Sequence, residues 1–99
     1  MCVCITEVNT VANKYAARKK FDEGVAAYVK NDFKTSVDLF SQAITYDPTL
    51  ALFFVCRGAA SLKLGRAHDA IGDFNQAIKL KSKYARAYHL RGLAYEKLG

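Results

Sequence analysis

Residues 17–50 of this 99-residue chain read ARKKFDEGVAAYVKNDFKTSVDLFSQAITYDPTL, and residues 51–84 read ALFFVCRGAASLKLGRAHDAIGDFNQAIKLKSKY. Placed one under the other, the two stretches carry several of the same residues at a spacing of 34, and residues 85–99 begin a third copy. The residues that match in this way include Gly24, Gly58 and Gly92; Ala26, Ala60 and Ala94; Phe40 and Phe74; and residues 42–44 and 76–78. A fixed period of this length is typical of a solenoid of stacked repeats.

Each 34-residue unit is predicted to form two helices joined by a tight turn. In the first unit, Phe21, Val25 and Tyr28 recur at the spacing that places them on one face of a helix. Asp32 is suited to cap the start of the second helix. Pro48 lies just beyond the end of that helix, because a residue that precedes proline is pushed out of the α region. The five expected helices cover residues 18–30, 33–46, 51–64, 67–80 and 84–98.

The glycine in the middle of each first helix indicates close packing between helices. Glycine costs up to about 1 kcal/mol relative to alanine inside a helix. A glycine repeated at one place in every unit therefore points to a steric need. We expect the second helix of each hairpin to come close there, with Ala43 and Ala77 supplying the small surface opposite the glycine. Phe40 and Phe74 are expected to fill the space beside the crossing.

These residues resemble the tetratricopeptide repeat (TPR), a 34-residue helix–turn–helix unit. The positions that match the family's pattern are Gly24, Phe40, Ala43 and Pro48 in the first unit, Phe54, Gly58, Ala70, Phe74 and Ala77 in the second, and Tyr88, Gly92 and Tyr95 in the third. The resemblance implies an all-α fold, an α-α superhelix (TPR solenoid) of antiparallel helix hairpins. It divides the chain into an N-terminal segment (1–16), repeat 1 (17–50), repeat 2 (51–84) and the first helix of an incomplete repeat 3 (85–99).

The first repeat departs from the family's pattern at Lys20 and Glu23, which stand where the family has tryptophan and leucine. A polar Lys20 is understandable, since no repeat precedes the first one. An apolar stripe at helical spacing precedes it instead, formed by Ile5, Val8, Ala12 and Tyr15. This stripe predicts that a helix begins at Thr6 or Thr10. We interpret the segment as a cap over the apolar end of the first hairpin, and the alternative is a built-in ligand that lies in the groove.

A TPR array is expected to bind polypeptides, and the resemblance implies that the first helix of each repeat lines the concave side of a right-handed superhelix. The groove-facing positions are Arg18, Phe21, Val25, Tyr28, Leu52, Val55, Ala59, Leu62, Arg86, His89, Leu93 and Glu96. We therefore expect a protein–protein interaction module, a scaffold or adaptor, with an apolar groove edged by Arg18 and Arg86. Such a groove suits an extended or helical peptide with apolar anchors and an acidic residue. The alternative is that this apolar stripe is core.

One TPR subfamily holds the C-terminal carboxylate of heat-shock chaperones with a clamp of lysine, asparagine and arginine side chains. The corresponding positions here are Phe21, Val25, Cys56, Arg86 and Leu90. Of these, Arg86 alone matches the residues of the clamp. We therefore expect no binding of the carboxylate-clamp type.

Nucleic-acid binding is the alternative function, because the net charge is +6 and the basic residues gather in two places. These residues are Lys79, Lys81, Lys83 and Arg86 between the second and third units, and Arg18, Lys19 and Lys20 before the first. Such binding would be steeply salt-dependent. The aromatic residues, however, lie at packing positions and are not interleaved with the lysines for base stacking.

No catalytic activity, metal site or cofactor is expected from the sequence. Cys2 and Cys4 would need two further metal ligands, and the histidines, His68 and His89, lie far along the chain. No motif places a nucleophile beside either histidine. An odd number of cysteines, three, without a signal peptide indicates free thiols in a reducing, cytoplasmic compartment. No apolar run is long enough to span a membrane.

The sequence ends after the first helix of a third unit, so that helix has no following helix to cover its apolar residues. These residues are Tyr88, Leu93, Tyr95 and Leu98. A repeat of this kind buries its apolar face by stacking on a neighbour. We expect the chain to be a fragment of a longer TPR protein, with self-association through the open helix as the alternative.

Overall fold

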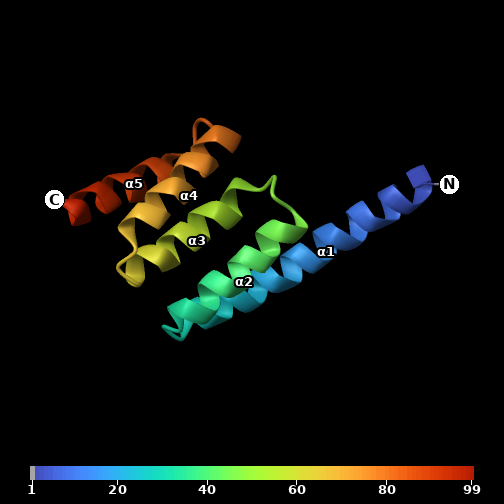
Figure 1. Cartoon of the computed structure of the whole chain (residues 1–99), viewed down its shortest axis with the longest axis horizontal. Coiled ribbons are helices and arrows are strands. Elements are labelled where there is room, and N and C mark those ends of the chain that lie inside the picture. The colour runs from blue at the N-terminus through green and yellow to red at the C-terminus, as the bar shows by residue number, and fades with distance from the viewer. Residues whose placement is uncertain (1) are drawn as a thin grey trace.

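The computed structural model describes the backbone of residues 2–99 and the side chains from residue 13 onward, and these residues form five α-helices and no strand (Figure 1). The helices are α1 (Cys2–Val29), α2 (Phe33–Tyr46), α3 (Ala51–Lys63), α4 (Ala67–Leu80) and α5 (Ala85–Leu98). α1 and α2 form one antiparallel hairpin, α3 and α4 form a second, and α5 packs against the second (Figure 1). The predicted all-α array of hairpins is confirmed.

Each helix packs mainly against the helices next to it in the sequence. α1 contacts α2, α2 contacts α3, α3 contacts α4, and α4 contacts α5, while α3 also touches α5. This pattern is typical of a solenoid, in which each unit contacts its neighbours. The molecule is accordingly elongated, with extents of 54 × 30 × 17 Å. Among the described helices, none has the length and apolar character that crossing a bilayer requires.

The helices begin and end close to where the sequence predicts. A capping side chain marks one boundary, and residues with a left-handed backbone conformation mark two others. The Asp32 carboxylate caps α2 by accepting a hydrogen bond from the backbone N–H of Thr35, at 3.3 Å. Asn31 and Gly65 adopt positive φ angles of 65° and 80° in the turns that join α1 to α2 and α3 to α4. Such angles suit glycine and, less readily, asparagine. Apart from the start of α1, every observed helix end lies within one residue of its predicted position.

An aromatic ring rests on the central glycine of each hairpin. A β-carbon at Gly24 would lie 2.6 Å from Cε1 of Phe40, and one at Gly58 would lie 2.5 Å from Cε1 of Phe74. Carbon atoms in good contact are about 3.5–4.0 Å apart. A larger residue at either glycine would therefore displace a ring that is at most 1% exposed. The predicted steric need for glycine is confirmed in both complete hairpins.

The prediction that alanines lie opposite these glycines was wrong. Ala43 packs with Ala17 and Phe53, and Ala77 packs in a cluster that contains Ala51. In both hairpins, the alanine thus meets the first helix about two turns before the glycine. Phenylalanine and alanine lie three positions apart on the second helix, on the same face. The repeat pattern therefore does not by itself decide which of them meets the glycine.

α1 is one continuous helix from Cys2, so the predicted starts at Thr6 and Thr10 were wrong. Its N-terminal part extends beyond α2 along the same direction (Figure 1). The backbone of residues 2–12 therefore does not turn back into a groove, as the built-in ligand would require. Tyr15, the described member of the apolar stripe, is 76% exposed. The other three side chains lie outside the described ones, and the capping role stays a prediction.

Candidate functional site

Three hollows lie along the side of the molecule where α1, α3 and α5, the first helices of the three repeats, contribute side chains. We call them the N-terminal, middle and C-terminal hollows. Their volumes are about 350, 420 and 610 Å³. Volumes of this size are comparable with small ligand pockets.

The middle hollow is apolar and draws its lining mainly from α1, α3 and α5. The residues that line it are Phe21, Val25, Tyr28, Phe40, Leu52, Val55, Cys56, Ala59, Arg86 and Leu90. Arg86 is the one charged residue of this described lining. The ring of Phe21 is held by two others, since its centroid lies 5.0 Å from that of Phe53 and 5.6 Å from that of Phe40. One wall of the hollow is therefore fixed in advance of any ligand.

Cys56 contributes apolar volume to the middle hollow. Burial raises the pKa of its thiol from 9.0 to about 11, and the positive charge of Arg86 acts against this rise. The thiol is therefore protonated at neutral pH, whereas a nucleophilic cysteine is a thiolate. Cys56 is half-buried, and a protonated thiol in such a position packs as a small apolar residue.

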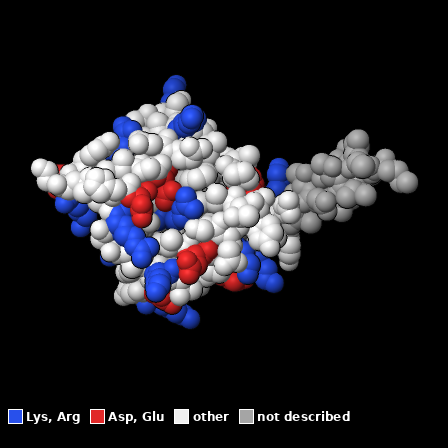
Figure 2. Space-filling model, viewed as in Figure 1, with Lys and Arg blue, Asp and Glu red and all other residues white. Residues whose placement is uncertain are grey.

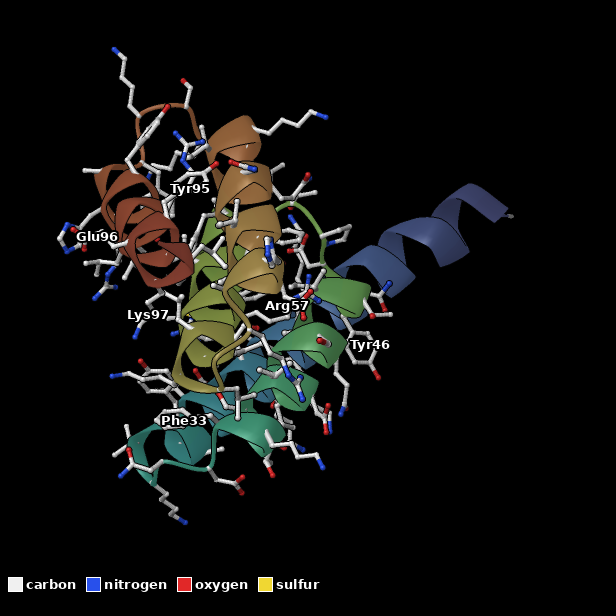
Figure 3. The ribbon with its side chains drawn as sticks, turned by 60° about the vertical axis from the view of Figure 1, so that its left-hand side comes forward. Phe33, Tyr46, Arg57, Tyr95, Glu96 and Lys97 are labelled. Atoms are coloured by element: carbon white, nitrogen blue, oxygen red, sulfur yellow. The ribbon has the colours of Figure 1, made fainter. Side chains whose placement is uncertain are left out.

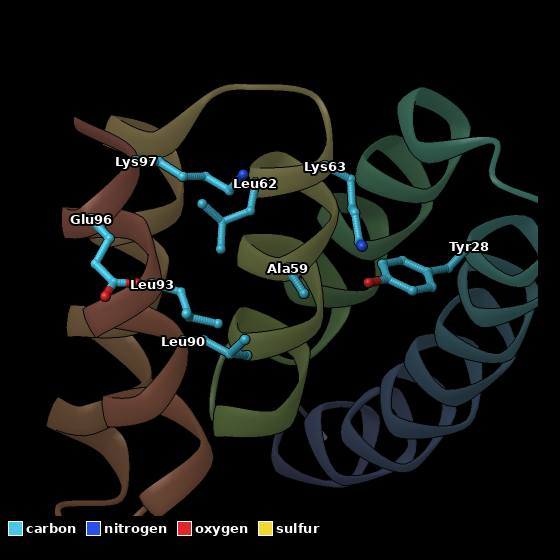
Figure 4. A pocket seen from close by; sticks show the side chains of 8 residues that line it. All are labelled: Tyr28, Ala59, Leu62, Lys63, Leu90, Leu93, Glu96 and Lys97. Atoms are coloured by element: carbon cyan, nitrogen blue, oxygen red, sulfur yellow. The ribbon is translucent and has the colours of Figure 1, made fainter. Parts of the chain in front are cut away.

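The C-terminal hollow lies between α3 and α5 (Figure 4). Leu62, Leu90 and Leu93 meet at its centre, and Tyr28 borders it from α1 (Figure 4). Its remaining lining residues are Ala59, Lys63, Glu96 and Lys97. This hollow therefore combines a leucine-rich floor with a rim that carries both signs of charge.

The N-terminal hollow is lined by Lys14, Arg18, Phe21, Asp47, Thr49, Leu50, Leu52 and Phe53. Nε of Arg18 lies 3.3 Å from Oδ1 of Asp22, and both side chains are largely exposed. The Asp47 carboxylate also has partners within the chain, because its Oδ1 accepts hydrogen bonds from the N–H and hydroxyl of Thr49, at 3.2 and 2.6 Å. Phe21 and Leu52 line this hollow and the middle one, so the two hollows are adjacent.

The structure places most of the predicted groove residues along these hollows. The predicted residues found in their linings are Arg18, Phe21, Val25, Tyr28, Leu52, Val55, Ala59, Leu62, Arg86, Leu93 and Glu96. His89 lines none of the three. Val55 is 2% exposed and belongs to the core, so the alternative that the stripe is core holds at this position. Val55 lies in the central helix, which has packed helices on both sides.

The prediction missed several residues that line the hollows, Leu90 above all. Leu90 borders both the middle and the C-terminal hollow. Cys56 precedes it by 34 residues and lines the middle hollow. Both residues occupy positions that correspond to the carboxylate clamp, and that comparison was the signal that could have placed them in the groove. All five clamp positions line the middle hollow: Phe21, Val25, Cys56, Arg86 and Leu90.

Solved structures of TPR domains superpose closely on this chain. The Arabidopsis OM64 TPR domain is 30% identical with a TM-score of 0.85, and the match covers 87% of this chain and 71% of that one. The second TPR of Spaghetti (RPAP3), bound to the HSP90 peptide SRMEEVD, is 29% identical with a TM-score of 0.87, and the match covers 94% and 84%.

Curated proteins match the chain over a small part of their own length. Protein SGT1 homolog of Oryza sativa subsp. japonica is 38% identical over 69 residues, which are 70% of this chain and 19% of that protein. Protein STIP1 homolog of Dictyostelium discoideum is 33% identical over 87 residues, 88% of this chain and 15% of that protein. The chain thus spans less than a fifth of these relatives. A family model described as TPR repeat matches residues 61–99. On this evidence and that of its structural neighbours, the chain belongs to the tetratricopeptide repeat family.

Proposed function

We propose that the chain is a non-enzymatic protein–protein interaction module that binds a peptide or a partner helix along the three hollows. The observation that carries this proposal is the middle hollow, an apolar cavity of about 420 Å³ in which Arg86 is the one charged residue among the described lining residues. Two structural neighbours support it. The second TPR of Spaghetti (RPAP3) is bound to an HSP90 peptide, and the TPR2B domain of yeast Sti1 is in complex with pHsp70.

An apolar side chain of the ligand is the main anchor. Burying one large apolar side chain contributes about 1.5–3 kcal/mol. An exposed ion pair between Arg86 and a ligand carboxylate contributes about 0.2–1 kcal/mol. The apolar contact therefore decides the affinity, while Arg86 favours ligands that carry an acidic residue beside the anchor.

A chaperone-tail carboxylate is a poor ligand for this groove. Four of the five clamp positions carry a phenyl ring, two aliphatic side chains and a protonated thiol, none of which has the positive charge to form an ion pair with a carboxylate. Moving a carboxylate out of water without a partner is costly. We expect the peptide SRMEEVD to bind with a dissociation constant weaker than about 1 mM, a free energy of about −4 kcal/mol. Micromolar binding by calorimetry would contradict this.

Three exposed apolar residues of the groove allow a test that leaves the core intact. Val25, Leu52 and Leu93 are 38–39% exposed, and Leu80, which lines none of the hollows, is 40% exposed and serves as a matched control. Peptides are selected from a displayed library against the wild-type chain. They are then titrated against Leu52→Gln, Leu93→Gln and Leu80→Gln.

We expect the selected peptides to carry apolar anchors with an acidic residue. Their affinity should fall about tenfold for Leu52→Gln and Leu93→Gln, equal to about 1.4 kcal/mol. It should be unchanged for Leu80→Gln. Peptides that bind all three variants as they bind the wild type dock elsewhere, and the groove proposal is then wrong.

Nucleic-acid binding is kept as the alternative because Lys79, Lys81, Lys83 and Arg86 are all exposed. On the face shown in Figure 2, however, acidic side chains lie between the lysines and arginines, and no continuous basic stripe forms. Filter binding with single-stranded RNA at low and high salt separates the two functions. Salt-sensitive binding that Leu52→Gln does not weaken would favour nucleic acid.

A further inference from the structure

A fourth hollow lies where the second helices of the two complete repeats, α2 and α4, flank α3. Its volume is about 380 Å³, and its described lining shares no residue with the three hollows of the groove. We call it the outer hollow. The residues that line it are Val37 and Ser41 of α2, Arg57 and Ser61 of α3, Arg66, and His68, Asp69, Gly72 and Asp73 of α4. The proposed peptide groove leaves this hollow without a role.

Two small residues of repeat 2 leave space in the outer hollow. Ser61 is 4% exposed and lies at the position where repeat 3 carries Tyr95, one of the residues that match the family's pattern. Repeat 2 therefore has a short hydroxyl side chain where repeat 3 has a phenol ring. Gly72 borders the same hollow, and a β-carbon there would meet no atom within 4 Å. The hollow thus accompanies a departure of repeat 2 from the pattern that repeat 3 follows.

Arg57 forms a fixed part of the wall of this hollow, between α2 and α4 (Figure 3). Its Nη1 donates a hydrogen bond to Oγ of Ser41 on α2, at 3.2 Å. Its Nε and Nη2 donate to the two carboxylate oxygens of Asp73 on α4, at 3.0 and 2.7 Å. Because both neighbouring helices hold the guanidinium, this wall is in place before any ligand arrives.

The formal charges of the arginines and aspartates in the described lining cancel. Arg57 and Arg66 are positive, and Asp69 and Asp73 are negative. A charged ligand group would therefore be attracted by one pair and repelled by the other. Among the side-chain hydrogen bonds within residues 13–99, none involves Ser61 or Asp69. A neutral group that both donates and accepts hydrogen bonds suits such a lining.

We propose that the outer hollow binds the side chain of a tyrosine from a partner polypeptide. The ring takes the space beside Gly72, and its hydroxyl accepts a hydrogen bond from Ser61 and donates one to Asp69. A cavity of about 150 Å³ is large enough to hold benzene. The outer hollow, at about 380 Å³, therefore admits a phenol ring.

The chemistry of the lining favours tyrosine over phenylalanine. A phenyl ring would cover the buried Ser61 hydroxyl without giving it a partner, and an unpaired buried hydroxyl costs binding free energy. Tyrosine is also among the residues that contribute most to binding when they enter a desolvated pocket. One inserted tyrosine is thus expected to anchor the partner on this side of the molecule.

A second copy of this chain is not the expected source of the tyrosine. Tyr15 is accessible, since it is 76% exposed. Each copy, however, carries a net charge of +6, and two like-charged copies repel each other. A partner with a neutral or acidic surface meets no such repulsion.

The probe is N-acetyl-tyrosinamide, and its binding to the ¹⁵N-labelled full chain is followed through the backbone amide signals. Two related probes distinguish the chemistry, because N-acetyl-phenylalaninamide lacks the hydroxyl and N-acetyl-phosphotyrosinamide adds negative charge. Gly72→Leu and Ser61→Tyr each fill the hollow. The matched control is Gly92→Leu. Gly92 is also an exposed helical glycine whose β-carbon would meet nothing within 4 Å, and it lines none of the four hollows.

We expect N-acetyl-tyrosinamide to bind the wild type and Gly92→Leu equally, with a dissociation constant on the order of 1–10 mM. The amide signals that shift should be those of residues that line the outer hollow. Gly72→Leu and Ser61→Tyr should each weaken binding by about tenfold or more, which equals about 1.4 kcal/mol. The phenylalanine analogue should bind several-fold more weakly than the tyrosine analogue. If Ser61→Tyr does not fold, Gly72→Leu alone decides.

Absence of saturable shifts overturns the proposal, as does binding that Gly72→Leu leaves unchanged. Shifts that Leu52→Gln abolishes and Gly72→Leu does not would place the ring in the groove instead. Equal binding of the phenylalanine analogue, or tighter binding of the phosphotyrosine analogue, overturns the assignment to tyrosine. Self-association that Gly72→Leu abolishes overturns it in favour of a second copy.

Discussion

α3 and α5 occupy the same place in consecutive repeats. The face of α3 that carries Gly58 is covered by α4, whereas the corresponding face of α5, which carries Gly92, is exposed to solvent. Gly58 lies under the ring of Phe74, whereas Gly92 has open space around it. The same residue type therefore serves a tight contact in one helix and no contact in the other. The comparison teaches that the glycine of this repeat belongs to the interface with the second helix and not to the first helix itself.

Substitution of aromatic residues should give the largest difference in the free energy of unfolding between the covered helix α3 and the exposed helix α5. Phe74→Ala removes a fully buried ring and should lower the free energy of unfolding by about 3–5 kcal/mol. Tyr88→Ala, on the bare helix, should lower it by less than about 1 kcal/mol. Urea unfolding followed by circular dichroism measures both. Equal losses would show that the two helices are covered alike.

Replacement of Gly58 and of Gly92 by alanine should change the free energy of unfolding in opposite directions. At Gly58 the added β-carbon meets the Phe74 ring at 2.5 Å, so Gly58→Ala should destabilise the fold by about 1–3 kcal/mol. At Gly92 nothing is displaced, and the better helix former should stabilise by up to about 1 kcal/mol. Thermal unfolding resolves the difference, since 1 kcal/mol shifts the midpoint of a domain of this size by about 4–8 °C. A stabilising Gly58→Ala would refute the steric explanation.

Removing the contacts of Arg57 and of Arg91 should give a smaller difference in the free energy of unfolding. Asp73→Ala removes two charge-assisted hydrogen bonds from Arg57 and should lower the free energy of unfolding by about 1 kcal/mol, because the Arg57 side chain, 26% exposed, can still turn to water. Arg91→Met removes no ion pair of the described residues and should change it by less than about 0.5 kcal/mol. Urea unfolding at low and high salt measures both, and a salt-independent loss for Asp73→Ala would argue against the charge contribution.

At neutral pH the smallest effect on stability is that of Cys56, whose counterpart in repeat 3 is Leu90. Because burial raises its pKa from 9.0 to about 11, alkylation by iodoacetamide should accelerate about tenfold per pH unit and level off near pH 11. The folded state then holds the proton more tightly than the unfolded state, so stability is unaffected below pH 9 and declines as the pH rises through about 11. The measurement uses a Cys2→Ser, Cys4→Ser chain, and levelling off near pH 9 would contradict it.

The sequence was sufficient for the helices, because helical spacing shows which face of each helix is apolar, and the positions that the family resemblance implied for the groove mostly line the three hollows. It did not decide how deeply a residue is buried. Val55 and Leu52 belong to the same stripe, yet they are 2% and 39% exposed, since burial depends on which helices flank each position. The choice of Phe40 over Ala43 as the neighbour of Gly24 depended likewise on the crossing of two helices. The start of α1 was missed because no capping residue marks it.

The contacts between neighbouring helices also bear on how the chain folds. Nearly all helix–helix contacts join segments that are adjacent in the sequence, so the loops that must close are short and their entropy cost is small. Chains with such local contacts fold fast. Either hairpin can form first and act as a template for the other. α5, which has the second hairpin on one side and solvent on the other, is then the segment whose amide protons should exchange first.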